Sequence, residues 1–397
     1  MSGARDRSGD GVGTGPLSVF GSFGYGNLGD ELVPRCLAHL LAEAGVWSGE
    51  PVAISRYGEV IAGDVLPSGP EARAALCDAS GRGRMVLVGG GIIEPRAGSS
   101  LNRAFDLARD LPGLDLRALA VSVEPGVRFS WLQKRRLARQ ARRLGPIGVR
   151  DVLSARVLQG LIPGHAIEVL GDIALWSQPA PLPPDIEAAV GPGGIAVILH
   201  NTWLDAEGFH DWLADELADL SQASGLSVVL LPFAIRRDRR DMRTHQRLGE
   251  ALAARGVKAA FPAEACPAEM FTPEVAAEIL RRSRLCVSMR LHGCVMAYAQ
   301  RTPFVGLAYH PKLAGFAETV GHGRFLLPRD LPGHQTPGHY GYGFGDLDFG
   351  RGELCRTGLA AMAEAEFSGL DFWRARQVDF VRAVFEVTGT EGPTPRG

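Results

Sequence analysis

The residues best suited to chemistry lie in one stretch of the chain, SMRLHGCVMAYAQRTPFVGLAYHPK (288–312). An apolar strand is predicted to end at Arg290, and a helix to begin at about Leu291, which puts His292 in its first turn. A cation at the N-terminal end of a helix opposes the helix dipole, so Arg290 requires an anion, either a bound ligand or the carboxylate of a salt bridge. Lys312 can meet the same anion from the next turn. His292 is either functional or a buried, hydrogen-bonded histidine.

A glycine-rich turn, GSFGYGNLGDE (21–31), follows the first predicted strand and leads into a helix. Its glycines permit close approach of a ligand, and Asn27 and Asp30 can cap the helix. The spacing formally satisfies G-x-G-x-x-G, but Asp30 and Glu31 at the start of the helix would repel a pyrophosphate. A neutral ligand with hydroxyl groups fits better, and the alternative is a purely structural turn.

Further candidates follow other predicted strands. Gly89 and Gly90 belong to GGGIIEP (89–95), which either lines the ligand site or lets a helix pack closely on the sheet. Arg150 ends a strand beside an aspartate, which favours a cap with an ion pair. His200 and Asn201 end the first strand of the second half and are expected to face the same site.

The elements that must position these residues follow a regular alternation. Short apolar runs bounded by glycine alternate with stretches of helical periodicity, which is typical of parallel strands joined by crossover helices. This pattern predicts an α/β protein with two halves, each built of parallel strands and crossover helices. The predicted strands are 17–21, 85–90, 116–123, 146–149, 194–200, 226–233, 257–261, 284–289 and 303–308.

The domain boundaries come from breaks in this pattern, above all the proline- and glycine-rich segment QPAPLPPDIEAAVGPGG. The segment 329–350 is predicted to be either a surface loop or a loop over the active site. The closing helices can pack back on the N-terminal domain. The predicted division is a disordered tail (1–16), an N-terminal Rossmann-like domain (17–177), a linker (178–194), a C-terminal Rossmann-like domain (195–328), a long loop (329–357) and closing helices (358–390).

The composition narrows the class of protein. The chain of 397 residues has 42 basic and 44 acidic residues, so its net charge of −2 provides no overall field for nucleic acid. The six cysteines have no metal-ligand spacing, so we expect reduced thiols in a cytoplasmic protein without a metal site. No apolar run approaches the roughly 18 residues of a membrane span, so no integral membrane segment is expected.

Four motifs in order resemble the motif series of the polysaccharide pyruvyl transferase family over residues 17–325: GYGNLGDE, VGGGII, GVRD and SMRLHG…PFVGLAYHPK. The resemblance implies a fold like glycosyltransferase type B, in which two Rossmann-like domains face a central cleft. It also implies transfer of a pyruvyl group from phosphoenolpyruvate, as co-substrate, onto two hydroxyls of a sugar to form a ketal, with no other cofactor. The acceptor stays open among a polysaccharide repeat, a lipid-linked sugar, a nucleoside and a small natural product, as does the oligomeric state.

The resemblance also implies roles for individual residues. Arg290 and His292 would contact the phosphate or carboxylate of the donor, and Asn27 and Asp30 would lie on the acceptor side. Because ketal formation needs an acid and a base, we hypothesise that Asp30 is the base and His292 the acid or the group that stabilises the departing phosphate. Guanidinium groups suit a donor that carries a phosphate and a carboxylate. The expected donor-binding residues are Arg290, Lys312, Arg150, Gly89 and Gly90, and the expected acceptor-binding residues are Asn27, Glu31, His200 and Asn201.

The sequence departs from the family pattern in three places. His200-Asn201 stands where family members often carry an arginine, GDIALW (171–176) lacks the usual proline and phenylalanine, and Glu94 replaces an expected aspartate. Two other functions therefore stay open. One is a glycosyltransferase of the same fold that uses a nucleotide sugar, and the other is a non-catalytic sugar-binding relative.

Overall fold

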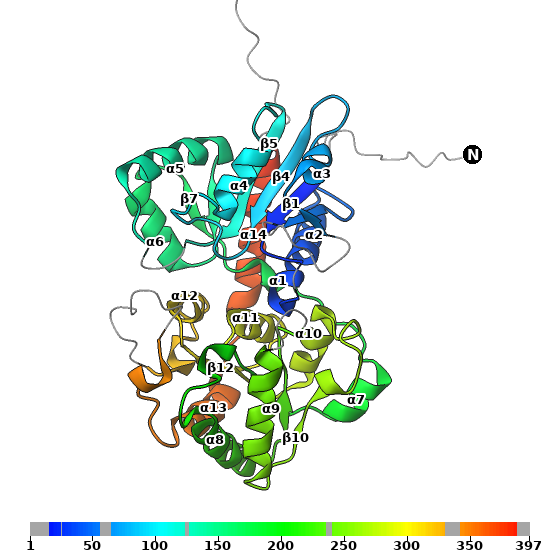
Figure 1. Cartoon of the computed structure of the whole chain (residues 1–397), viewed down its shortest axis with the longest axis vertical. Helices are drawn as coiled ribbons and strands as arrows, with labels where there is room; N and C mark the ends of the chain where they lie inside the picture. The colour runs from blue at the N-terminus through cyan, green and yellow to red at the C-terminus, as the bar shows by residue number, and fades with distance from the viewer. Residues whose placement is uncertain are drawn as a thin grey trace, which may run out of the picture.

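The computed structural model describes residues 16–24, 26–55, 65–123, 127–235, 240–329 and 342–386. Two α/β domains lie one above the other in Figure 1, each built on a parallel sheet. The structure therefore confirms the predicted fold class of two Rossmann-like domains. The predicted tail, apart from Pro16, and most of the segment 329–350 lie outside the described residues.

The N-terminal domain contains a seven-stranded parallel sheet in the order β3-β2-β1-β4-β5-β6-β7. The strands in the middle of the sheet are mainly apolar, and their carboxyl-terminal halves are buried, as expected of strands covered on both faces. The strands are β1 (Leu17–Gly21), β2 (Val52–Ser55), β3 (Val65–Pro67), β4 (Gly83–Val88), β5 (Leu114–Val121), β6 (Ile147–Val149) and β7 (Ile167–Val169). The helices are α1 (Leu28–Glu31), α2 (Val33–Glu43), α3 (Pro70–Ala74), α4 (Ser100–Leu107), α5 (Trp131–Leu144), α6 (Val152–Leu161) and the 3₁₀ helix η1 (Ile173–Trp176).

The C-terminal domain contains a six-stranded parallel sheet in the order β10-β9-β8-β11-β12-β13. Its strands are β8 (Ile195–Ile198), β9 (Val228–Leu230), β10 (Ala259–Ala260), β11 (Leu285–Ser288), β12 (Phe304–Leu307) and β13 (Leu326–Leu327). Its α-helices are α7 (Pro184–Val190), α8 (Phe209–Ser224), α9 (Arg240–Ala253), α10 (Pro273–Arg282), α11 (Leu291–Ala299), α12 (Pro311–Thr319) and α13 (Glu353–Glu364). The described residues of this domain also form the 3₁₀ helices η2 (Asn201–Trp203), η3 (Pro262–Glu264), η4 (Gly323–Phe325) and η5 (Phe344–Asp346).

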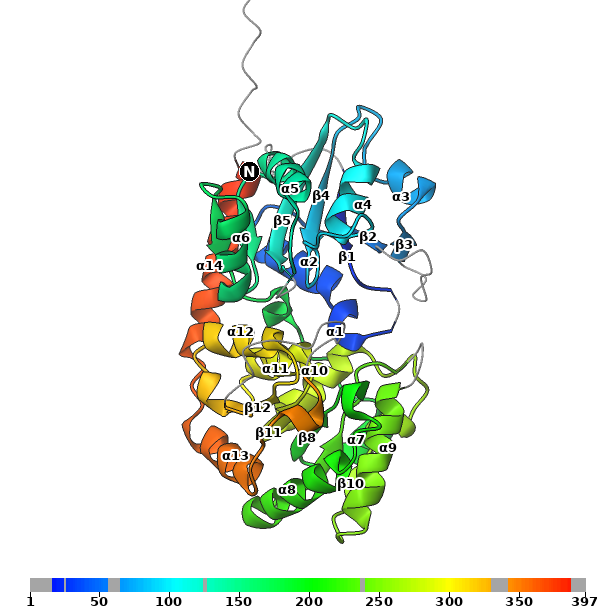
Figure 2. The same ribbon diagram turned by 60° about the vertical axis from the view of Figure 1, so that its left-hand side comes forward.

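The two domains meet through the segments that follow their strands. In Figure 2, α1 of the upper domain lies against α10 and α11 of the lower domain. Leu28 and Leu32 belong to the same buried apolar cluster as Phe233 and Val295, so the core continues across the junction. The carboxyl ends of parallel strands share one edge of a sheet, and ligands of such folds bind at that edge. The fold therefore brings both carboxyl edges to the junction.

The last helix, α14 (Ser368–Glu386), connects the domains and runs along the left-hand side of the molecule in Figure 2. It contacts α2 and η1 of the N-terminal domain. The amide of Gln377 donates to the carbonyls of Leu170 and Asp172 at 3.0 and 3.1 Å, and its oxygen accepts from the indole of Trp176. These bonds fix the segment after β7, which is the segment that carries Asp172.

Some predicted boundaries need correction. The segment 178–194 is not a plain linker, because α7 forms inside it with a proline in its first turn and with Ile186 and Val190 buried. The long loop does not reach residue 357, because α13 begins at Glu353. The Glu216 carboxylate accepts the backbone N–H groups of Gly352 and Leu354 and so caps this helix from a distant element, which local sequence cannot show.

Candidate functional site

His292 lies at the junction between two carboxylates of the opposite domain. It stands in the first turn of α11, as predicted, and its Nδ1 is 3.7 Å from Oδ1 of Asp30 in α1. Its Nε2 is 3.9 Å from Oδ2 of Asp172, which follows β7. Both distances are longer than a hydrogen bond, as catalytic contacts often are before a substrate binds. The two domains together thus place one imidazole between two carboxylates.

Gly29 allows this close approach. A Cβ atom at position 29 would lie 2.6 Å from Cγ of His292, and closer still to its Cβ and Nδ1. Such contacts are much shorter than the roughly 3.5–4.0 Å at which carbon atoms pack. A glycine in α1 is therefore required for His292 to stand beside Asp30.

Arg290 forms a buried ion pair. Its Nε and Nη2 donate to the two oxygens of Asp241 in α9, at 2.6 and 2.7 Å. One Asp241 oxygen also accepts the N–H of Ala234 at 2.9 Å. Burial raises the pKa of Asp241, but the charge and hydrogen bonds of Arg290 outweigh this and hold that pKa below its usual value. The sequence left open whether the anion beside Arg290 is a bound ligand or a salt-bridge carboxylate, and the structure contains the carboxylate of Asp241.

A neutral aromatic group adjoins this ion pair. His200, directly after β8, stacks on Tyr309 with ring centroids 5.0 Å apart, and its Nδ1 accepts the N–H of Thr202 at 3.0 Å. Burial and the positive charge of Arg290 lower the pKa of His200 to about 3. His200 is therefore neutral at physiological pH and adds no positive charge to the site.

Arg150 is buried rather than open to a ligand. Arg150 and Asp172 are each 2% exposed, and Arg150 Nη1 lies 3.6 Å from Asp172 Oδ2. Arg150 Nε also donates to Asp151 at 3.3 Å. A Cβ at position 90 would lie 3.0 Å from Arg150 Nη1, so Gly90 leaves room for the guanidinium. Arg150 Nη2 and Asp172 Oδ2 have no hydrogen-bond partner among the described residues, so the pair is incompletely satisfied.

The glycine-rich turn is held by an acidic residue at the start of the helix. Glu31 accepts the backbone N–H of Gly24 at 2.9 Å and that of Gly26 at 2.8 Å. Asn27 does not cap α1, because its amide donates to Asp30 at 2.5 Å. Its backbone forms an isolated bridge with Ala234 of the other domain. Glu31 thus shapes the turn, and Asn27 orients the carboxylate of Asp30.

The remaining predicted site residues lie at ends of strands. Gly89 follows β4 with a φ of 97°, a conformation that favours glycine. Asn201 begins η2 directly after His200. Lys312 lies in the first turn of α12, where its backbone N–H donates to Nδ1 of the buried His310 at 3.2 Å. All three positions are on the carboxyl edges that meet at the junction.

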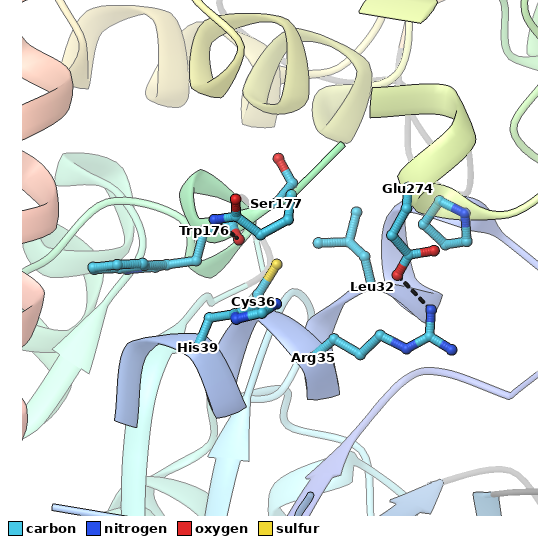
Figure 3. A pocket seen from close by; sticks show the side chains of 9 residues that line it. Leu32, Arg35, Cys36, His39, Trp176, Ser177 and Glu274 are labelled. Carbon is cyan, nitrogen blue, oxygen red and sulfur yellow. Dashed lines mark hydrogen bonds and ion pairs between the residues drawn. The ribbon is translucent and has the colours of Figure 1, made fainter. Parts of the chain in front are cut away.

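A small pocket lies elsewhere at the junction. Arg35 of α2 forms an ion pair with Glu274 of α10 at its rim, and Cys36 and Trp176 line it (Figure 3). Its volume of about 20 Å³ holds one water molecule. Burial raises the pKa of the Cys36 thiol well above its usual value, which disfavours the thiolate form.

Two residues of the site were not assigned a role from sequence. Asp172 belongs to GDIALW, which was noted for a departure from the family pattern, and the signal was an acidic residue directly after a short strand. Asp241 belongs to the charged run RRDRRDMR, and such a run is typical of a solvent-exposed helix face, so the sequence does not distinguish this aspartate from its neighbours. Among the described residues, no three histidine, cysteine or acidic side chains are placed to hold a metal ion. None of the described helices is long and apolar enough to cross a membrane.

The fold is that of a two-domain α/β protein of glycosyltransferase type B architecture. A putative UDP-N-acetylglucosamine 2-epimerase from Listeria monocytogenes is similar, with a TM-score of 0.56, 14% identity, and coverage of 95% of this chain and 98% of that one. The S. aureus MnaA–UDP structure has a TM-score of 0.52 at 9% identity, with coverage of 96% and 99%. At these identities the likeness concerns the fold alone.

The family model described as polysaccharide pyruvyl transferase matches residues 27–311. The match covers more than half of the chain and includes Asp30, Asp172 and the segment from Arg290 to His310, so the chain belongs to this family. The protein is therefore a transferase. No curated protein sequence matches this chain.

Proposed function

We propose that this protein transfers the pyruvyl group of phosphoenolpyruvate to two hydroxyls of a sugar-containing acceptor, giving a ketal and inorganic phosphate. The observation that carries the proposal is the position of His292 between Asp30 and Asp172. Ketal formation from an enol phosphate needs one group that donates a proton to carbon and one that accepts a hydroxyl proton. An imidazole beside a carboxylate supplies both.

In the first step, one acceptor hydroxyl adds to C2 of phosphoenolpyruvate. Asp30 takes the proton of that hydroxyl, and His292 gives a proton to the methylene carbon, which becomes the methyl group. In the second step, the other hydroxyl displaces phosphate from the same carbon, and its proton leaves with the phosphate. Asp172 stabilises the protonated imidazole from the side opposite Asp30.

The buried pairs position these groups. Arg290 is fixed by Asp241, so its remaining nitrogen, Nη1, presents a pre-oriented positive charge to the donor. Arg150 acts on the reaction through Asp172, because it is buried beside that carboxylate. The neutral His200 on Tyr309 offers a flat surface, which suits the acceptor sugar better than an anion.

Calorimetric titration with two donors tests the proposal. Phosphoenolpyruvate should bind to the protein, and UDP-N-acetylglucosamine should not. Asp172→Asn should leave the affinity for phosphoenolpyruvate within about threefold of wild type, because Asp172 contacts His292 rather than the donor. Binding of the nucleotide sugar without binding of phosphoenolpyruvate would support the glycosyltransferase alternative and contradict the proposal.

A further inference from the structure

Helix α5 concentrates positive charge on one surface of a chain that is almost neutral. Its sequence, WLQKRRLARQARRL, contains no acidic residue. It lies on the left flank of the N-terminal domain in Figure 1. Its six cations are all exposed and form no ion pair with any residue that the structure describes. They are Lys134, Arg135, Arg136, Arg139, Arg142 and Arg143.

The stability of the helix does not explain this composition. Arg135 and Arg139, and Arg139 and Arg143, are like charges four residues apart, which destabilises a helix. Lys134 and Arg135 also oppose the dipole in the first turns. The helix is stabilised instead by a capping box, in which Ser130 and Gln133 bond each other's backbone N–H groups, and by burial of its opposite face. An arrangement that costs local stability indicates a functional surface.

Two apolar side chains accompany the charges. Trp131 is 64% exposed and Leu132 is 70% exposed, and they are two of the five large hydrophobic side chains that are exposed among the described residues. Because a helix turns about 100° per residue, both lie with the arginines on one arc of about 140°. The buried residues occupy the opposite side of the helix, namely Leu137, Gln140, Ala141 and Leu144.

The start of this helix lies at the same edge of the domain as the site. Helix α5 begins after the carboxyl end of β5, the edge from which the loops reach the junction. The side-chain amide of Gln133 donates to the carbonyl of Pro95 at 2.8 Å, which joins the start of the helix to the segment after β4. Gly90, which packs on Arg150, belongs to that segment.

We infer that α5 docks the protein on an anionic phospholipid bilayer. The exposed arginines would lie among the phosphate groups, while Trp131 and Leu132 enter the interface between headgroups and acyl chains. A basic helix with a tryptophan and an aliphatic side chain on the same exposed arc matches this environment in both charge and polarity. A soluble polyanion would use the charges but leave Leu132 in water. The docking does not depend on the proposed reaction.

Flotation of the full-length protein with vesicles tests the inference. The protein should float with vesicles of phosphatidylcholine mixed with phosphatidylglycerol at low salt, and should not float with phosphatidylcholine alone. The triple variant R135Q/R139Q/R142Q should bind the anionic vesicles on the order of 100-fold more weakly. W131A/L132A should bind them about tenfold more weakly. Each variant should melt at a temperature no lower than that of the wild type, because none of these side chains is buried.

Matched controls use residues on other elements. R109Q/R301Q/R356Q removes three exposed arginines that are paired with acidic residues, and F372A removes an exposed aromatic ring from α14; both should bind like wild type. Absence of binding to anionic vesicles at low salt would overturn the inference. Unchanged binding of the α5 variants to the vesicles would also overturn it. So would a finding that the protein binds a soluble acidic polysaccharide as tightly as the vesicles and that W131A/L132A weakens neither interaction.

Discussion

A methyl group added at Gly29 should push His292 of the C-terminal domain away from Asp30 of the N-terminal domain. In Gly29→Ala, the new Cβ would lie 2.6 Å from Cγ of His292, so the imidazole has to move by about 1 Å to restore an ordinary contact. A displacement of this size at a reacting group costs on the order of 100-fold in turnover. The expected result is a loss of about 100-fold in kcat.

The effect on stability is smaller and has two opposing parts. Alanine is favoured over glycine within a helix by about 1 kcal/mol, whereas overpacking at a buried contact costs about 1–3 kcal/mol. Gly29→Ala should therefore lower the free energy of unfolding by up to about 2 kcal/mol. Gly160→Ala in α6 is the matched control, because a Cβ there meets no atom within 4 Å. It should stabilise the protein by up to about 1 kcal/mol.

Urea denaturation gives the two unfolding free energies, and phosphate release from phosphoenolpyruvate with an acceptor gives the two rates. If Gly29→Ala were stabilised as much as Gly160→Ala and released phosphate at the wild-type rate, His292 would not stand against α1. The proposed pairing of His292 with Asp30 would then be refuted.

Three further changes test other parts of the site. Asp241→Asn leaves Arg290 buried without its counter-charge and should lower the free energy of unfolding, measured in urea, by about 3–5 kcal/mol. The control Asp205→Asn breaks an exposed ion pair and should lower it by under about 1 kcal/mol. Similar losses in the two variants would contradict the role of Asp241. His200 is neutral in the folded protein and takes up a proton on unfolding below about pH 6.5. Between pH 7 and pH 5, the free energy of unfolding of the wild type should therefore fall by up to about 2 kcal/mol more than that of His200→Gln. Parallel plots of unfolding free energy against pH for the two proteins would refute the neutral state. Asp172→Asn should reduce kcat about 100-fold in steady-state assays without raising the KM for phosphoenolpyruvate, and a change confined to KM would move Asp172 to donor binding.

The central strands could be predicted because they are apolar runs that end at glycine or at a polar residue. Buried parallel strands of this kind are visible in β1, β4, β8 and β11 without any tertiary information. The short strands β2, β3, β7 and β13 were not predicted, because two to four residues carry too little periodicity.

The candidate site shows the same division between local and long-range information. Arg290 and His292 could be identified because a cation at the start of a helix conflicts with the helix dipole. Asp241 could not be paired with Arg290, because 49 residues separate them and the contact exists only when β9 and β11 lie in one sheet. The burial of Arg150 also depends on the packing of Gly90.

The basic helix shows the converse case. Its charges are plain in the sequence, but a net charge of −2 for the whole chain conceals them. The exposure of Trp131 and Leu132 depends on which face of α5 packs on the sheet, and this becomes known with the fold.

The central claim concerns the fate of C2 of phosphoenolpyruvate, and carbon NMR follows that atom directly. The protein is incubated with phosphoenolpyruvate labelled with ¹³C at C2 and with a panel of sugars that carry two neighbouring hydroxyls. With an accepted sugar, the labelled carbon should change from the vinyl signal of the donor to the signal of a ketal carbon, and one phosphate should be released for each ketal formed. His292→Gln should abolish both changes. Phosphate release that leaves the label in free pyruvate, or ketal formation that survives loss of His292, would contradict the account.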